Sequence, residues 1–418
     1  MAEPLVAEPL VADRPLSSPL MRDRSPWLLD PDVVFLNHGS LGSCPAPVLA
    51  AQRAWTDRLE RQPILFLDRE LPHLLADARE EIGRLLGAEP DDLAFVTNAT
   101  SGVNAVVRSL DLGRGDEILT TDHEYNACLN VLHEASARTG VGVVIAGIPF
   151  PIDSPQAVVE AILSRATRRT RLAVLSHITS PTAIVFPIER LVAELTARGI
   201  DTLVDAAHAP GQVPVELTTL GAAYWTGNGH KWLCAPKGTA VLWVRRDRQE
   251  PIRPLVISHG ANDPDPSRTR FRKEFDWPGT TDPTGHLAIA DAIRFLGSLR
   301  PGGWPELMAE NHALALRGRD LVCEALGVLP PAPDSMLGAM AAVPLPPSLV
   351  EAAGGPLALK TSLYDEDRVE VPITPWPVPA ARAADEPARA TLLRISAQAY
   401  NVPADYEALA DALRRRLG

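Results

Sequence analysis

Short apolar runs alternate with longer amphipathic stretches along the first two thirds of the chain. The apolar runs carry little polar alternation, which is typical of strands that helices cover on both faces of a mostly parallel sheet. These runs lie at residues 93–98, 117–121, 141–148, 171–178 and 201–208. The stretches with helical periodicity lie at residues 48–62, 73–87, 101–110, 127–140, 157–167 and 188–199. This alternation predicts a doubly wound α/β large domain over residues 46–285.

The pattern changes after Trp277, and a smaller α+β domain is expected over residues 286–418. Its elements would be two amphipathic helices, a Pro-rich stretch, two strands and a closing helix. In chain order they occupy residues 286–299, 311–327, 344–356, 357–373, 390–401 and 405–418. At the other end, residues 1–25 are rich in Ala, Pro and acids, which predicts a disordered tail.

Charge and cysteine content exclude several classes of function. The chain has 418 residues and a formal net charge of −12, and binding to nucleic acid or to an anionic membrane needs basic patches instead. No apolar run has the length of a membrane span, and the N-terminus lacks the pattern of a signal peptide. The four cysteines form no CxxC pair, which predicts free thiols in a reducing cytoplasm and no thiolate metal site.

Four polar segments follow expected strands, and the carboxyl ends of parallel strands line a common crevice. In TNATSGVN, residues 97–104, small residues open a helix and let backbone N–H groups reach an anion, although Thr and Ser are also ordinary N-caps. In DHEYNA, His123 fits either stacking on a flat ring or a local hydrogen bond. The other two segments are VDAAHAPG, with Asp205, and TGNGHKW, with Lys231.

The carboxylate of Asp205 and the amine of Lys231 are groups that could bind a cofactor with a basic ring. A buried carboxylate needs a cationic partner, and a protonated pyridine nitrogen is one; the alternative is a helix N-cap. Lys231 has little charge nearby, which lowers a lysine's affinity for protons and favours the neutral amine that forms an imine. The alternative is a lysine whose ammonium group reaches solvent.

Taken in order, these segments resemble a known family. With SHITSPTAIVFPI, WPGTTD and RISAQAYN, they are similar to class V aminotransferases, which are fold-type I pyridoxal phosphate (PLP) enzymes. The isopenicillin N epimerase-like subgroup is the most similar, and cysteine desulfurases are related. The resemblance runs from about Phe35 to the C-terminus. It implies a three-layer α/β large domain with a mostly parallel sheet, a smaller α+β C-terminal domain, and an N-terminal segment, residues 26–45, that packs at the active site.

The resemblance also implies a role for each matching residue around pyridoxal 5'-phosphate. Lys231 would hold PLP as a Schiff base and move the substrate's α-proton, and Asp205 would pair with the ring nitrogen. His123 would stack on the ring, with Tyr125 as the alternative. The other implied contacts are His208 and Ser180 to the phenolic oxygen, and Ala99, Thr100, Asn228 and His230 to the phosphate.

The implied substrate is a small molecule: an amino acid or a compound derived from one. Arg394 would clamp its carboxylate with two hydrogen bonds. The turn formed by Asn37, His38 and Gly39 would face the same carboxylate. Thr280 would reach the phosphate of a neighbouring subunit, which implies a homodimer with shared active sites.

Three reactions remain open, and epimerisation ranks slightly above β-elimination at a carbon–sulfur bond, with transamination third. Epimerisation needs a second acid beyond Lys231, and the candidates are Tyr125, His38 and Tyr364. A desulfurase of this superfamily needs a nucleophilic cysteine shortly before the carboxylate arginine. Residues 369–393 contain no cysteine, so persulfide-forming desulfuration is not expected.

Other classes of protein fit the sequence less well. A ligand-binding relative of this fold would usually have lost the lysine or the aspartate, and both are present. A Rossmann nucleotide enzyme would carry GxGxxG after its first strand, and a metal hydrolase would show HExxH spacing. Neither motif occurs, so no metal is expected.

Overall fold

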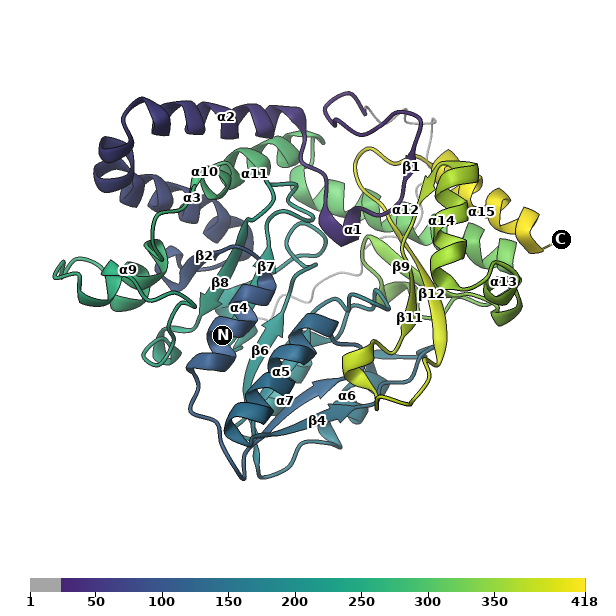
Figure 1. Cartoon of the computed structure of the whole chain (residues 1–418), viewed down its shortest axis with the longest axis horizontal. Coiled ribbons are helices and arrows are strands. Elements are labelled where there is room, and N and C mark those ends of the chain that lie inside the picture. Colours follow the sequence, from purple (N-terminus) through teal and green to yellow (C-terminus); the bar gives the residue numbers. More distant parts are fainter. Residues whose placement is uncertain (1–23, 418) are drawn as a thin grey trace, which may run out of the picture.

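The computed structural model describes residues 24–417, so the expected tail lies almost wholly outside the described residues. Its centre is a seven-stranded sheet with the order β2-β8-β7-β6-β5-β3-β4 (Figure 1). Neighbouring strands are parallel from β7 to β4, whereas β8 is antiparallel to both of its neighbours. The strands are β2 (Leu93–Val96), β3 (Glu117–Thr121), β4 (Gly142–Ala146), β5 (Thr170–Ser176), β6 (Asp201–Asp205), β7 (Tyr224–Asn228) and β8 (Ala240–Val244). The prediction of a mostly parallel sheet is therefore confirmed.

Side chains of this sheet divide between two hydrophobic clusters, one on each face. Consecutive residues join opposite clusters, as Ile118 and Leu119 of β3 do, because side chains alternate along a strand. One face is covered by α4 (Ala99–Ser109) and α5 (Asn126–Thr139), and the other by α6 (Pro155–Leu163) and α7 (Ile188–Thr196). The chain thus has the expected three-layer α/β arrangement.

Further helices extend the layer that contains α7. The long helices α2 (Ala46–Arg61) and α3 (Leu71–Leu86), joined through a π-helical turn, pack against α11 (Ile289–Ser298) (Figure 1). Within residues 24–417, no helix is both long enough and apolar enough to cross a membrane. The shorter helices are α1 (His38–Leu41), α8 (Leu217–Leu220), α9 (Arg270–Asp276), α10 (Thr284–Leu287) and α13 (Pro347–Ala352).

The C-terminal part is a three-stranded antiparallel sheet with the order β11-β12-β9 and helices packed against it. Helix α12 packs along α15, and α12 also contacts β9. The small α+β unit is present, but the boundary at residue 285 stays a prediction, because α11 packs on α3 as well as on α12. The elements are β9 (Met340–Pro344), β11 (Ile373–Trp376), β12 (Ala390–Ser396), α12 (Gly303–Leu326) and α15 (Pro403–Leu417).

The strand expected within residues 357–373 is mostly a helix, α14 (Pro356–Asp367). Its two buried residues, Leu359 and Leu363, are four positions apart, which is a helical spacing. Only the last residues of the segment are extended, in the short β10 (Val369–Glu370) and at the start of β11. The prediction was wrong here because the other positions of α14 carry little apolar signal.

The N-terminal segment ties the two parts of the chain together. Strand β1 (Val34–Phe35) pairs in parallel with β10, and the side chain of Asn401 donates to the carbonyl of Phe35. Immediately afterwards, the ring of His38 lies 3.0 Å from the carbonyl oxygen of Lys231. Residues 34–41 therefore lie between the carboxyl ends of the large sheet and the C-terminal part.

Candidate active site

A cavity of about 500 Å³ opens at the carboxyl ends of β5, β6 and β7, where ligands bind in parallel α/β sheets. Segments that are far apart in the chain meet in its wall. Of the site residues expected from the sequence, those that line it are Ala99, Thr100, Tyr125, Ser180, Asp205, His208, Asn228, His230 and Lys231.

Lys231 follows β7, and its Nζ lies 3.2 Å from Nε2 of His208. The pKa of Lys231 is lowered to about 7, first by burial and then by the positive charge of Arg394. The negative charge of the nearby Asp205 raises this pKa by a smaller amount. At neutral pH, a lysine with such a pKa is about half in the neutral amine form, which is the form that attacks a carbonyl carbon. The site thus prepares Lys231 for imine chemistry.

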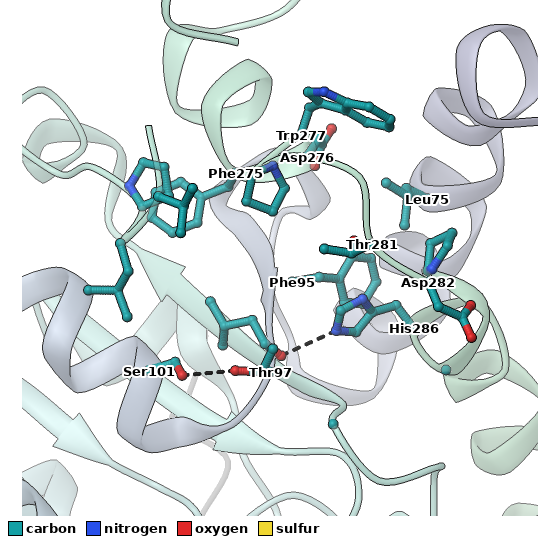
Figure 2. A pocket seen from close by; sticks show the side chains of 18 of the residues that line it. Leu75, Phe95, Thr97, Ser101, Phe275, Asp276, Trp277, Thr281, Asp282 and His286 are labelled. Carbon is teal, nitrogen blue, oxygen red and sulfur yellow. Dashed lines mark hydrogen bonds between the residues drawn. The ribbon is translucent and has the colours of Figure 1, made fainter. Parts of the chain in front are cut away.

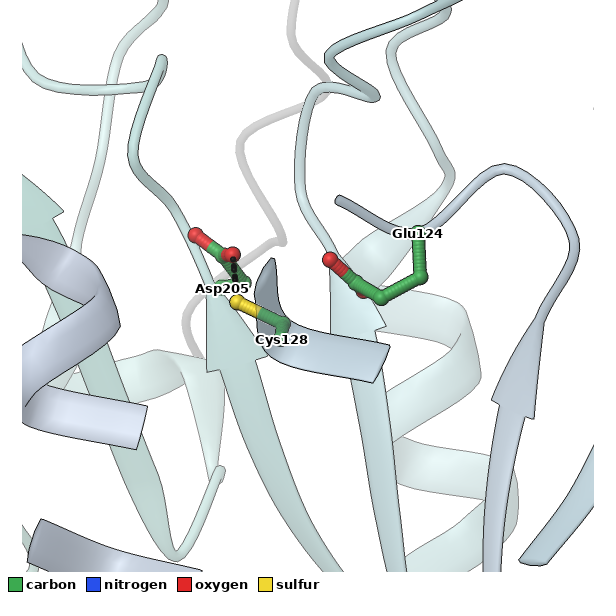
Figure 3. Close-up of side chains that lie close together, drawn as sticks. All are labelled: Glu124, Cys128 and Asp205. Atoms are coloured by element: carbon green, nitrogen blue, oxygen red, sulfur yellow. Dashed lines mark hydrogen bonds between the residues drawn. The ribbon is translucent and has the colours of Figure 1, made fainter. Parts of the chain in front are cut away.

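Asp205 ends β6 and is 4% exposed. One carboxylate oxygen accepts from the N–H of Ala207 at 2.9 Å, and the other accepts from the thiol of Cys128 at 3.0 Å. Figure 3 shows Glu124 on the other side of this thiol. Within residues 24–417, Asp205 forms no ion pair, so it can accept a cationic ring nitrogen that enters the cavity.

The first turn of α4 forms a cradle for an anion. Asn98 caps the helix by accepting from the N–H of Ser101 at 2.8 Å, and Asn228 accepts from the N–H of Ala99 at the same distance. The N–H of Thr100 has no acceptor in the described part of the chain. Since a helix N-terminus favours negative charge, this free N–H and the Asn228 amide suit a phosphate.

Arg394, on β12, is a buried cation without an acid partner among the described residues. Its guanidinium donates to Ser40 Oγ at 3.0 Å and to the carbonyl oxygen of Ser180 at 2.5 Å, while its Nε is buried without a partner. Burial lowers the pKa of Arg394 to about 10. Since a buried charge needs a partner, a carboxylate that enters beside Ser40 and Ser180 would supply it.

His123 does not reach the cavity, so the expectation that it stacks on a ring is not met. Its side chain is fully buried, lies edge-on to Trp376, and contacts Thr182 Oγ1 at 2.6 Å through Nδ1. Burial lowers its pKa to about 3, so it is neutral. Tyr125, the alternative candidate, is 45% exposed and lines the cavity. Stacking of Tyr125 on a ring therefore stays a prediction.

The turn at residues 37–39 contacts the backbone of Lys231 and the C-terminal part of the chain. His38 is buried between Tyr400 Oη and the carbonyl of Lys231, and the N–H of Gly39 donates to a buried serine on β12. Asn37 binds Glu370 and lies in a neighbouring cavity with Tyr364. The next residue, Ser40, which we did not predict, contacts Arg394. That the turn itself faces a substrate carboxylate stays a prediction.

A second cavity, of about 540 Å³, lies beside the first and shares Ser101 with it (Figure 2). Trp277 and Thr281 of the WPGTTD segment line it, together with His286. Thr280 itself is exposed and lines neither cavity. Its expected contact with a neighbouring subunit stays a prediction.

The chain matches the family model for aminotransferase class-V over residues 61–316. It is 38% identical over 400 residues to an isopenicillin N epimerase of Amycolatopsis lactamdurans, an alignment that covers 92% of this chain and 96% of that protein. This chain belongs to the aminotransferase class-V family. Members of this family are PLP-dependent enzymes, so the cavity is where this cofactor is expected, and its residues fit it: a lysine of low pKa, an unpaired aspartate and an anion cradle.

Two further matches are a curated relative and a solved structure. A putative L-cysteine desulfhydrase of Oryza sativa is 33% identical over 418 residues, which cover 92% of this chain and 85% of that protein. A solved structure of a C-DES mutant with glycine covalently linked to the PLP cofactor has a TM-score of 0.76 at 21% identity, and the match covers 94% of this chain and 99% of that one. The fold of this class-V enzyme is therefore shared with a PLP-bound structure, whereas its curated relatives are named for different reactions.

Proposed function

We propose that this class-V enzyme binds PLP at Lys231 and inverts the α-carbon of an amino acid or amino-acid-derived substrate, as an isopenicillin N epimerase-like enzyme does. The observation that carries the proposal is the buried, unpaired Arg394, whose two serine partners line the cavity that contains Lys231. An arginine placed this way suits a carboxylate, and Lys231 lies where it can act on the neighbouring carbon.

Each of these residues has a distinct task. Ser40 and Ser180 hold the Arg394 guanidinium, which binds the α-carboxylate and fixes the position of the α-carbon. Lys231 takes up the α-proton, for which its pKa of about 7 is suitable. PLP, when bound, supplies a ring that accepts the electron pair left on the α-carbon.

Inversion also requires an acid that returns a proton to the opposite side of the α-carbon, and Tyr125 is the best placed of the three candidates. His38 and Tyr364 do not line the cavity, whereas Tyr125 does. Tyr125 follows β3 and Lys231 follows β7, and β6 with Asp205 lies between these strands in the sheet. The two side chains therefore approach the cavity from opposite sides of Asp205.

Elimination of a sulfur-bearing group from the β-carbon is the second candidate reaction. Its support is the desulfhydrase relatives, of which the Oryza sativa protein covers almost the same length of this chain as the epimerase does. Elimination needs Lys231 and Arg394 but no second acid. The role of Tyr125 thus separates the two candidates.

Incubation of the purified enzyme with amino acids in D2O tests the proposal. Epimerisation gives deuterium at the α-carbon with inverted configuration, whereas elimination from cysteine gives pyruvate, ammonia and sulfide. A keto acid that forms only when an amino acceptor is added indicates transamination. The Lys231→Ala variant is the control for all three. A wild-type protein that binds no PLP refutes the proposal as a whole.

We also propose that two copies of the chain form a homodimer over the second cavity. Leu255, Val256 and Ile257 are each about half exposed, and two of them line that cavity. An exposed apolar run of this kind is typical of a protein interface. Light scattering should give the mass of two chains, and Val256→Asp should give one. A wild-type monomer at micromolar concentration contradicts this proposal.

A further inference from the structure

Three buried groups crowd together beneath the cavity, and only Asp205 of the three faces it. Glu124, Cys128 and Asp205 each place an oxygen or sulfur atom within 4.8 Å of the others (Figure 3). Neither Glu124 nor Cys128 has a role in the function proposed above, although both are fully buried. A buried acid and a buried thiol thus lie within 4.8 Å of the aspartate that is expected to bind a ring nitrogen.

We propose that Glu124 and Cys128 are positioning residues for the cofactor's ring nitrogen: both present a proton to Asp205 and so keep its carboxylate ionised. The inference rests on the proposed binding of PLP at Lys231 and deepens it. Glu124 and Cys128 would strengthen the ion pair between Asp205 and the ring nitrogen without contacting the substrate.

The hydrogen bonds of Glu124 indicate where its proton lies. One oxygen, Oε1, accepts from the hydroxyl of Ser176 at 2.9 Å and from the N–H of Tyr125 at 2.7 Å. The other oxygen, Oε2, is buried and accepts no hydrogen bond within residues 24–417. Because the donors occupy Oε1, the proton of a neutral Glu124 belongs on Oε2, and the carboxyl group extends toward Asp205 and Cys128 (Figure 3).

Electrostatics also favour a neutral Glu124 beside Asp205. Two carboxylates in one buried site cannot both be ionised without a cation between them. Burial, and then the charge of Asp205, raise the pKa of Glu124 well above its usual range. Burial and the same charge raise the pKa of Cys128 likewise, so it remains a thiol. Asp205 receives hydrogen bonds from Cys128 and from the N–H of Ala207, which stabilise its negative charge.

The hydrogen bonds to Asp205 would also influence the protonation of the ring nitrogen. In a dry site, an aspartate and a pyridinium tend to share the proton as a neutral pair, because burial disfavours both charges. Hydrogen bonds donated to the aspartate oppose this transfer and leave the proton on the nitrogen. The ring then withdraws electrons more strongly, which is the property that the proposed reaction uses.

The test uses PLP labelled with ¹⁵N at the ring nitrogen and bound to the full-length enzyme. Solid-state NMR should give a pyridinium signal for the wild type and a signal shifted toward neutral pyridine for Cys128→Ala, whose affinity for PLP should fall roughly tenfold. Cys128→Ser keeps a donor and should keep the signal. Glu124→Gln should also keep it, because an amide can accept from Ser176 and donate to Asp205 as the neutral acid does.

The matched control is Cys323→Ala, which changes a buried cysteine of α12. It should leave the pyridinium signal and the affinity for PLP unchanged. An unshifted signal with unchanged affinity in Cys128→Ala overturns the inference while the proposed function stands. A lost pyridinium signal in Glu124→Gln overturns the assignment of Glu124 as a neutral acid. A stoichiometric metal ion that depends on Cys128 would show that the cluster is a metal site instead. A wild-type enzyme that binds no PLP overturns both proposals.

Discussion

The indole N–H of Trp232 donates to Nδ1 of His208 at 3.3 Å. Burial, and then the charge of Lys231, lower the pKa of His208 well below its usual range, so the ring is neutral. A neutral imidazole that accepts at Nδ1 carries its proton on Nε2. That nitrogen lies 3.2 Å from Nζ of Lys231. Trp232 therefore makes His208 a hydrogen-bond donor toward the cavity.

Trp232→Phe removes this donor and lets the His208 proton move to Nδ1. We expect the affinity for PLP to fall about fivefold, which corresponds to the loss of one hydrogen bond of about 1 kcal/mol. Fluorescence titration of the cofactor-free protein measures it. The matched control is Trp243→Phe, since that buried indole N–H has no hydrogen-bond partner in the described chain. Equal losses in both variants would contradict a specific role for Trp232.

The rate at which cofactor-free enzyme captures PLP should rise with pH and level off above about pH 7. Lys231 is protonated below its pKa of about 7 and is a neutral nucleophile above it. Stopped-flow absorbance of the bound cofactor, with borohydride trapping, gives this profile. Arg394→Met removes a charge that lowers the pKa of Lys231, so its midpoint should move upward. A rate that still rises above about pH 9, as for an ordinary lysine, would contradict the prediction.

Arg394→Ala should raise the KM for every α-amino acid substrate roughly 100-fold. Loss of one partner from a buried, hydrogen-bonded charge pair costs about 2–5 kcal/mol. The absorbance of bound PLP should persist, because the cofactor contacts lie on other elements. Steady-state kinetics beside an absorption spectrum make the comparison, with the surface variant Arg317→Ala as the control. An unchanged KM would mean that the carboxylate binds elsewhere.

Tyr125→Phe separates inversion from α-proton exchange. If Tyr125 returns the proton, its loss should slow epimerisation roughly 100-fold or more, which is the usual contribution of a general acid. Exchange of the α-proton of one enantiomer with D2O should continue, because Lys231 catalyses it alone. Chiral chromatography and NMR follow the two processes. Full epimerisation by the variant would exclude Tyr125, and an elimination product formed at the wild-type rate would favour the lyase reaction.

Gly102→Ala should lower the stability of the fold and the affinity for PLP together. A methyl group at Gly102 would overlap the side chain of Thr226 on β7, and it would push the start of α4 away from the sheet. Overpacking of this kind costs about 1–3 kcal/mol. The melting temperature should fall, whereas Gly113→Ala, with no neighbour closer than 4.0 Å, is the neutral control. Equal melting temperatures would contradict this prediction.

The positions of the principal site residues could be predicted from the sequence, because these residues lie at or just after the ends of strands. Asp205 and Lys231 directly follow buried runs, and parallel strands bring such positions to one edge of a sheet. The direction of a side chain within a loop has no such rule. His123 and Tyr125 are two residues apart, yet packing against Trp376, far along the chain, draws His123 inward and leaves Tyr125 at the cavity.

Contacts between distant segments were harder to predict than the motifs themselves. Ser40 follows a recognised turn, but only the folded chain shows that it, rather than the turn, contacts Arg394. Glu124 lies within the recognised DHEYNA motif and Cys128 directly follows that motif. The sequence alone does not distinguish a buried acid at such a position from a solvated one. Their packing on Asp205 comes from the neighbouring positions of β3, β5 and β6 in the sheet.

The bond between Arg394 and Ser40 joins positions 354 residues apart, and this distance orders events during synthesis on the ribosome. The residues of the cofactor cavity, from Asn98 to Lys231, emerge well before Arg394 does. A growing chain therefore contains the residues proposed to hold PLP long before it contains the arginine proposed to recognise a carboxylate.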